Sequence, residues 1–306
     1  MIDVRDCVSD GNDILLQHEM EQKIQCTARP KRERPKKLTT YHVQLATSYY
    51  FSRYLQTMML IRYLSQIGRY FIMLKEVFNK PTKWSMMKQL IFKEIDDLII
   101  DSLGIVSFIS FFVGGVVAIQ TALNLTNPLI PKYLIGFATR QSVILEFAPT
   151  FISVIMAGKM GSFITSSIGT MRVTEQIDAL EVMGVNSLNY LVFPKIIALL
   201  LYPFVIGLSM FLGVFGGYIA GVYGGFTSSA EFIQGIQTEF IPFHITYAFI
   251  KTIVFALILA TIPSFHGFYM KGGALEVGKA STVAFVWTSV VIILMNYILT
   301  QLLLSS

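Results

Sequence analysis

Long runs of apolar residues dominate the chain from residue 101 onward. No charged residue occurs between Asp101 and Lys132. Because about 20 apolar residues in a helix cross a hydrocarbon core about 30 Å thick, this run predicts a first membrane span near 103–124. The same pattern predicts four further spans, at about 141–168, between Lys195 and Glu231, at about 243–268 and at 282–304.

Three of these spans have distinctive features. The second contains Glu146, Pro149 and Lys159, and the fourth contains Lys251 and Pro263. The third stretch is long enough to cross with tilt or to continue into a short outer helix. The pattern as a whole predicts an all-α integral membrane protein with about five transmembrane helices.

The first 100 residues have a different pattern. Residues 1–40 are polar and mixed in charge, which predicts a solvated, disordered tail. In residues 41–100, apolar side chains recur every three or four positions among basic ones, and Pro81 divides the stretch into two helices. Basic amphipathic helices of this kind lie in the headgroup plane. We therefore expect a tail at 1–40, interfacial or elbow helices at 41–100 and a transmembrane domain at 101–306.

Composition strengthens this interpretation. The chain is 54% hydrophobic and only 14% charged, whereas a soluble domain carries roughly 25% charged residues. Its net charge of +5 comes entirely from the first 100 residues, just before the first long apolar run. A basic flank in that position is better explained as a cytoplasmic anchor than as a nucleic-acid surface. We therefore expect no nucleic-acid partner.

The distribution of Lys and Arg predicts the orientation. With the N-terminus inside, the inner loops at 169–195 and 269–281 hold four basic residues, and the outer loops at 125–140 and 225–242 hold two. The positive-inside rule then places the N-terminus in the cytoplasm and the C-terminus outside.

No catalytic or metal site is evident. Residues 273–280, GALEVGKA, fit the spacing of a phosphate-binding loop, but Ala280 replaces the Ser or Thr that holds the metal, and no soluble strand precedes it. We expect a flexible glycine-rich turn there. The four histidines have no metal-ligand spacing.

A stripe of glycines marks the third span. Gly213, Gly217, Gly221 and Gly225 recur every fourth residue, and small residues at that spacing let another helix approach closely. Packing within the chain and a contact between subunits are equally compatible with this pattern.

Glu146 lies inside predicted hydrocarbon, where a charged side chain costs roughly 2.5–3.5 kcal/mol on insertion scales. Lys159 lies 13 residues further on, about 20 Å along a helix, so the two cannot pair. A salt bridge from Glu146 to another helix is one interpretation. We favour the other, a water-accessible cavity lined by Glu146 and Lys159.

The loop between the second and third spans resembles a short amphipathic helix. Glu175, Asp178 and Glu181 lie on one flank and Ile177, Leu180 and Met183 on the other, and Gly184 is a natural helix stop. Its acidic character favours a basic protein groove over an anionic membrane surface.

Three stretches carry a resemblance to a known family: LEFAP at 145–149, AGKMGS at 157–162 and IGTMRVTEQIDALEVMGV at 168–185. They resemble the permease subunit of Mla/Mce-type phospholipid ABC transporters, the MlaE family. The similarity runs from about residue 60 to the C-terminus. The family often has Arg before the acidic residue, where this chain has Leu145, so the resemblance does not supply the partner of Glu146.

The resemblance implies a homodimer in a bacterial inner membrane, with a separate ABC ATPase below it and Mce-domain lipid-binding proteins above it. Phospholipid is then held in a cavity that includes Glu146. ATP and Mg are bound by the ATPase, so we expect no cofactor on this chain. The implied coupling helix, which seats in the ATPase, comprises Arg172, Glu175, Gln176, Asp178, Glu181 and Gly184.

Two alternatives stay open at this point. A proton-coupled secondary transporter would use Glu146 as its proton site, although such proteins typically show internal repeats. A membrane scaffold without transport activity would use Glu146 only structurally.

Overall fold

The computed structural model describes residues 64–79, 84–125 and 130–304. The tail expected at 1–40 and the first part of the region 41–100 lie outside the described residues. Residues 67–306 form one compact unit, and the description below concerns that unit.

The described part of the chain is helical and contains no strand. The helix at the start of this unit ends at residue 77. Its residues 67–77 are called the lateral helix below. The elements that follow are α3 (Trp84–Ile95), η1 (Asp96–Ile100), α4 (Asp101–Asn124), α5 (Tyr133–Ser142), η2 (Val143–Phe151), α6 (Ile152–Met156), η3 (Ala157–Gly161), α7 (Ser162–Val173), α8 (Gln176–Val182), α9 (Ser187–Leu199), α10 (Tyr202–Tyr223), α11 (Ser229–Gln237), α12 (Phe243–Phe268) and α13 (Ala274–Leu304).

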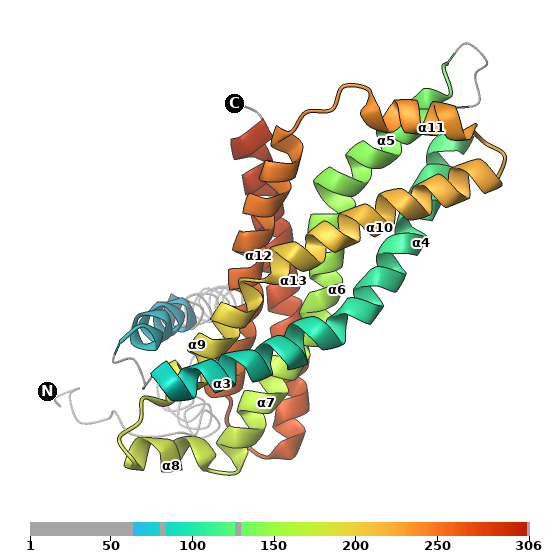
Figure 1. Cartoon of the computed structure of the whole chain (residues 1–306). Helices are drawn as coiled ribbons and strands as arrows, with labels where there is room; N and C mark the ends of the chain where they lie inside the picture. Colours follow the sequence, from blue (N-terminus) through green and yellow to red (C-terminus); the bar gives the residue numbers. More distant parts are fainter. Residues whose placement is uncertain (1–63, 80–83, 126–129, 305–306) are drawn as a thin grey trace, which may run out of the picture. The chain divides into compact units, whose positions relative to one another are not determined.

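Among the described residues, five helices are long and apolar enough to cross a membrane, which confirms the predicted number. They are Met86–Asn124, Tyr133–Val173, Ser187–Tyr223, Phe243–Phe268 and Ala274–Leu303. The short α8 lies at one end of the bundle, and α5 and α11 lie at the other (Figure 1). The protein is therefore an all-α, multi-pass membrane protein.

Two boundaries differ from the sequence-based expectations. The first helix continues without a break across residue 100, where we expected the membrane domain to begin, because neither Gly nor Pro interrupts it between Trp84 and Leu103. The glycine-rich stretch at 273–280 is not a turn: α13 begins at Ala274, and Lys279 pairs with Glu276 at 2.6 Å.

In the described ranges, three segments have π-helical geometry, η1, η2 and η3, and the last two lie in the second span. Insertions of this kind are rare and often occur at functional sites. Glu146 and Pro149 lie on η2, and Lys159 lies on η3. The irregular helix therefore coincides with the charged residues of this span.

Helices α4 and α10 pack along each other more extensively than any other pair of described elements. A Cβ atom added at Gly114 would lie 1.8 Å from the carbonyl oxygen of Gly213, and one at Gly216 would lie 2.0 Å from that of Phe111. The two backbones are therefore in direct contact, as small-residue packing in membranes permits.

The predicted glycine stripe faces the interior of the chain over most of its length. A Cβ at Gly213 would meet Val143, one at Gly217 would meet Thr139, and one at Gly221 would contact Phe232. Gly225 does not belong to the stripe: it lies beyond the end of α10, with φ 74° and nothing within 4 Å of an added Cβ. The helix ends at Tyr223, two residues before it, so Gly225 serves the turn.

Arg140 lies on α5 and joins this helix to α11, at the end of the bundle opposite α8. Its guanidinium donates to the carbonyl oxygens of Ile236 at 2.6 Å and Thr238 at 3.0 Å, at the C-terminal end of α11. The last carbonyls of a helix have no intrahelical partner. Arg140 supplies one, although it lies in a predicted outer loop.

We expect Gly114→Ala to destabilise the protein, because its new methyl group collides with the backbone of α10. Overpacking of this kind costs about 1–3 kcal/mol. Thermal unfolding of the purified protein in detergent measures the effect. Gly104→Ala, on the same helix but with nothing within 4 Å of the added atom, is the matched control. Equal midpoints for the two variants would contradict the packing described here.

Candidate functional site: a buried polar network and an exposed loop helix

Glu146 pairs with Lys251. Glu146 lies on η2 and Lys251 on α12, and Lys251 Nζ lies 3.1 Å from Glu146 Oε1. The lysine side chain is fully buried, whereas the glutamate side chain is 44% exposed. The structure thus contains the salt bridge to another helix. It also leaves the carboxylate partly open, so the cavity interpretation of Glu146 stays a prediction.

Lys251 makes two further hydrogen bonds, to the carbonyl oxygen of Leu145 at 3.1 Å and to Tyr247 Oη at 3.0 Å. Pro149 lies four residues after Leu145 and has no N–H to donate back along the helix. The ammonium group of Lys251 thus bonds to the backbone of η2 close to a residue that cannot donate.

The second carboxylate oxygen of Glu146 binds α13. Asn296 Nδ2 donates to Oε2 at 3.1 Å. Thr150 Oγ1 lies 3.1 Å from the same oxygen and 3.0 Å from Asn296 Oδ1, and its single proton serves either acceptor. Three spans therefore meet at Glu146.

The donor and the acceptor can be assigned for each hydrogen bond in the series that links Lys251 to α13. Thr300 Oγ1 donates to the carbonyl oxygen of Asn296 at 2.8 Å. Tyr247, 2.8 Å from Thr300 Oγ1, is therefore the donor in that contact, and Tyr247 in turn accepts from Lys251. The chain runs from Lys251 through Tyr247 and Thr300 to the backbone of α13.

Lys159, the other predicted cavity residue, lies elsewhere. It is exposed on η3, and its ammonium group donates to the carbonyl oxygen of Asp101. The structure does not bring Lys159 and Glu146 together. The cation that meets Glu146 is Lys251, the only Lys or Arg between Lys195 and Lys271. A single lysine in a long apolar run was the sequence feature that could have identified the partner of Glu146.

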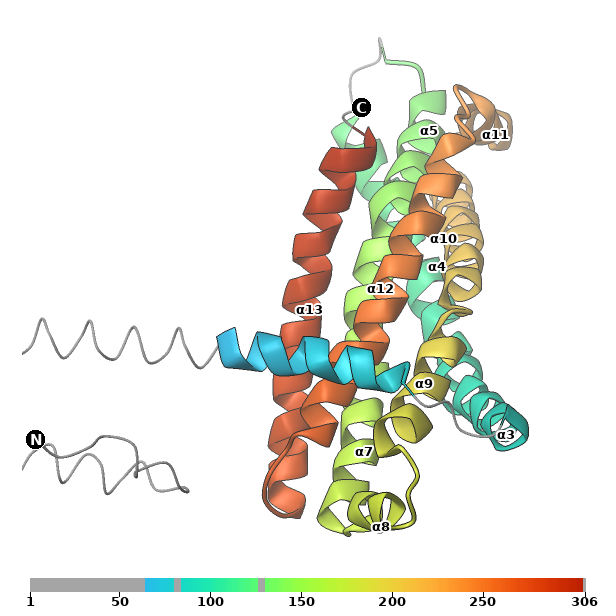
Figure 2. The ribbon, with the colours of Figure 1, turned by 90° about the vertical axis from the view of Figure 1, so that its left-hand side faces the viewer.

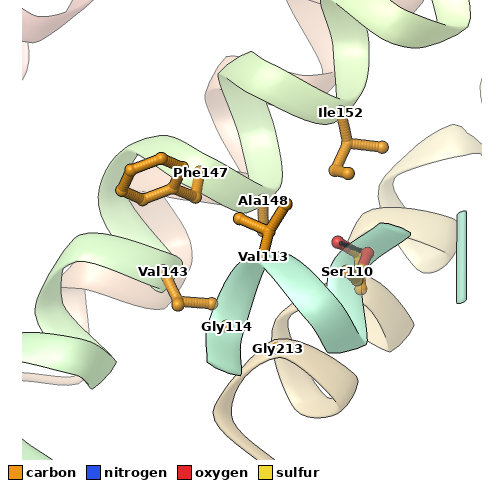
Figure 3. Close-up of a pocket in the computed structure, with 9 residues that line it drawn as sticks. Ser110, Val113, Gly114, Val143, Phe147, Ala148, Ile152 and Gly213 are labelled. Atoms are coloured by element: carbon orange, nitrogen blue, oxygen red, sulfur yellow. Dashed lines mark hydrogen bonds between the residues drawn. The ribbon is translucent and has the colours of Figure 1, made fainter. Parts of the chain in front are cut away.

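Two cavities beside η2 are too small to hold a two-chain lipid. The first, between α4, η2 and α10, has a volume of about 10 Å³, the size of one water molecule. Its polar residues Ser110 and Ser209 bond to each other at 2.7 Å, and apolar side chains such as Val113, Val143 and Ile152 surround it (Figure 3). The second, between α10 and α12, has about 300 Å³, the lower end of the range for drug-sized ligands.

The predicted loop helix is divided by a corner. Helix α7 ends at Val173, Glu175 has a positive φ of 58°, and α8 covers Gln176–Val182. Arg172 spans the corner, with Nη1 2.7 Å from Asp178 Oδ1, and its guanidinium lies 6.0 Å from the ring of Phe268. This ion pair and ring contact connect α7, α8 and the end of α12.

Gly184 ends α8 as its residue type predicts. Its φ is 75°, its N–H donates to the carbonyl of Glu181 at 2.9 Å, and the N–H of Val185 donates to that of Leu180 at 3.1 Å. This pair of bonds is the Schellman motif.

The surface of α8 combines acidic and apolar groups. Ile177 is buried against the bundle, whereas Val182 is 90% and Met183 68% exposed. The predicted coupling residues Glu175, Gln176, Asp178 and Glu181 are also exposed. Met183, which the helical pattern places on the same apolar flank as Ile177, therefore lies on the exposed surface.

We expect an asymmetric effect when the Glu146–Lys251 pair is broken. Glu146→Gln leaves a fully buried ammonium without a counter-charge, and breaking a buried pair costs about 3–5 kcal/mol. Lys251→Met leaves a carboxylate that is partly exposed and still bound by Asn296, so it costs less. Unfolding in detergent measures both.

The double variant Glu146→Gln/Lys251→Met is the control for this prediction. Because neither side chain then carries a charge, we expect the double variant to lose less free energy of unfolding than the two single variants lose together. Strict additivity would mean that the ion pair contributes nothing.

Comparison with known proteins identifies the family. The family model described as "Permease MlaE" matches residues 91–302. A protein of Rickettsia bellii named "Probable ABC transporter permease protein" is 32% identical over 243 residues, which cover 79% of this chain and 93% of that protein. The Haemophilus influenzae protein "Intermembrane phospholipid transport system permease protein MlaE" is 28% identical and covers 70% of this chain and 82% of its own length.

A plant protein is also similar. "Protein TRIGALACTOSYLDIACYLGLYCEROL 1, chloroplastic" of Arabidopsis thaliana is 32% identical over 203 residues, which cover 65% of this chain and 57% of that protein. A permease of an ABC transporter is not its catalytic subunit and works with an ATPase partner. The chain belongs to the MlaE family of ABC transporter permeases.

Proposed function

We propose that this permease moves phospholipid between the inner and outer membranes of a double-membraned bacterium. The Glu146–Lys251 network carries the proposal, because it puts a partly exposed glutamate side chain and a buried ammonium within two membrane-spanning helices. Charged groups inside membrane spans typically mark a substrate or ion pathway. The name of the Haemophilus influenzae relative supports phospholipid as the substrate.

The lipid site is formed by two copies of the chain. The cavities beside η2 are too small for a phospholipid, and α13 is the least buried of the five spans. Its exposed side chains include Trp287, Val290, Ile293, Leu294 and Tyr297. A second copy placed against α13 encloses the exposed side of Glu146, and the cavity between the copies holds the lipid.

Helix α8 docks into the ATPase subunit. Exposed acidic side chains beside the apolar Val182 and Met183 fit a groove with basic and apolar walls. ATP and Mg are bound by that subunit, and this chain supplies the pathway. The N-terminus and α8 then face the cytoplasm, and Mce-domain lipid-binding proteins receive or deliver lipid at the opposite face.

In this mechanism, closure of the ATPase subunits displaces α8 in both copies. The displacement rearranges the two halves and narrows the cavity at Glu146, which expels the lipid. Only the difference in affinity of the lipid for the open and closed states can drive the change in the lipid's position. A carboxylate–ammonium pair that faces the lipid headgroup in one state and is closed off in the other supplies such a difference.

The function is tested by reconstituting the permease with its ATPase in vesicles and following a fluorescent phospholipid. We expect Glu146→Gln to reduce ATP-dependent lipid movement by at least about tenfold, the equivalent of roughly 1.4 kcal/mol. Glu276→Gln, which removes a partly exposed carboxylate that pairs with Lys279 of its own helix, is the control. Lipid movement driven by a proton gradient without the ATPase would favour a secondary transporter, and full activity of Glu146→Gln would favour a structural role.

The docking surface has its own test. We expect the double variant Glu175→Lys/Glu181→Lys to insert into the membrane normally and to lose the ATPase on affinity purification, because it reverses the charge of the exposed face of α8. The control is Glu239→Lys, at an exposed carboxylate in the segment between α11 and α12. An unchanged yield of ATPase would rule out α8 as the docking helix.

A further inference from the structure

The lateral helix packs across the bundle instead of along it. It is drawn in blue and crosses α12 and α13 transversely (Figure 2). Its side chains Met73 and Val77 are completely buried, whereas Phe71 and Ile72 are exposed. One face of the helix is therefore part of the core, and the helix is fixed to the bundle along its length.

The C-terminal end of the lateral helix is held by two asparagine side chains. Asn186 Nδ2 donates to the carbonyl oxygens of Glu76 at 3.1 Å and Asn79 at 2.8 Å. Asn189 Nδ2 donates to that of Val77 at 2.6 Å. The last carbonyls of a helix lack intrahelical donors, and here side chains from a segment more than 100 positions away in the sequence supply them.

Asn186 also connects the loop helix to the next span. Its Oδ1 accepts from the backbone N–H of Asn189 at 3.2 Å and so caps α9. It follows two residues after Gly184, where α8 ends. The neighbouring Ser187 Oγ donates to Glu181 Oε1 of α8 at 2.8 Å. The end of α8, the start of α9 and the end of the lateral helix are thus joined at one point.

The other part of the lateral helix is joined to α12. Tyr70 Oη lies 2.7 Å from Thr261 Oγ1, and Thr261 gives its own proton to the carbonyl of Leu257, so Tyr70 is the donor. The Tyr70 ring also meets Phe265 edge to face, with centroids 5.9 Å apart. Burial raises the pKa of Tyr70, which keeps the donor protonated.

These contacts form a continuous route from α8 to the helix that carries Lys251. The route enters the lateral helix at its contact with Asn186 and leaves it at the contact of Tyr70 with Thr261. Thr261 lies ten residues from Lys251 on α12, or about 15 Å along the axis. Coupling between distant sites is carried by packed, hydrogen-bonded elements of this kind, and it has to be established by measurement.

We propose that the lateral helix is a strut that transmits displacement of α8 to α12, and that Tyr70, Asn186 and Asn189 are its positioning residues. This inference rests on the proposed docking of the ATPase at α8. It assigns to the lateral helix a mechanical role in lipid transport beyond that of an anchor in the headgroup plane.

Two conservative variants test the strut. Tyr70→Phe removes only the hydroxyl and keeps the ring against Phe265. Asn186→Asp keeps an acceptor that can cap α9 and removes both donors to the lateral helix. Tyr218→Phe is the matched control, because it removes a hydroxyl that bonds Ser229 at 2.8 Å between α10 and α11, away from the route.

The measurement uses the permease–ATPase complex in vesicles of phosphatidylethanolamine and phosphatidylglycerol with a fluorescent phosphatidylglycerol tracer. ATP hydrolysis and tracer movement are recorded together. We expect each test variant to retain the ATPase and its hydrolysis rate but to move at least about fivefold less lipid per ATP, as loss of a typical coupling implies. Tyr218→Phe keeps the wild-type ratio.

The double variant Tyr70→Phe/Asn186→Asp gives a second criterion. Because the two contacts act in series on one strut, its ratio of lipid to ATP equals that of the more impaired single variant. A purely structural role would lower the midpoint of thermal unfolding and leave the ratio unchanged, which would overturn the inference. Failure of the proposed function differs from this outcome, because the wild-type complex itself would then bind no ATPase or move no tracer.

Discussion

The arrangement of the membrane helices depends on one constraint: a charged group in hydrocarbon has to find its partners within the protein. Lys251 is completely buried on α12, so three neighbours supply its acceptors: the Glu146 carboxylate, the Tyr247 hydroxyl and the carbonyl of Leu145. That carbonyl lies four residues before Pro149, which has no N–H to donate within η2. Asn296 then attaches α13 to the same carboxylate. A single ammonium group thereby fixes the relative positions of three spans.

Packing elsewhere in the bundle relies on close backbone approach. Gly114 and Gly216 allow α4 and α10 to touch, and lipid offers no hydrophobic drive that could replace such contact. The α4–α10 pair is held by direct backbone contact, whereas α13 packs on α7 and α12 through its side chains and is the least buried span. This contrast agrees with the proposal that α13 meets a second copy of the chain, because Glu146 is partly exposed and bonds to Asn296 of that helix.

The sequence predicted the elements better than their contacts. The fourth span, Phe243–Phe268, has the boundaries that hydropathy gave, and Gly184 ends α8 as expected. The partner of Glu146 could not be predicted, because Lys251 lies 105 positions away and only tertiary packing joins them. The close contact of α4 involves Gly114, which no regular spacing marked. The corner at Glu175 was hidden as well, because a positive φ at a glutamate leaves no signal in residue type.

The same constraint separates the parts of the molecule that can move from those that cannot. The acidic side chains of α8 are exposed, so a change in their contacts exchanges one partner for water or for another protein and costs only about 0.5–1.5 kcal/mol net per hydrogen bond. The Lys251–Glu146 pair has no such substitute, and separating its charges leaves one buried alone. The proposed transport cycle therefore changes contacts at the α8 end of the bundle and moves the ion pair as a unit, with Glu146, Lys251 and Asn296 kept together. In that proposal the lipid site opens by displacement between the two copies, and the charges inside each copy stay matched throughout.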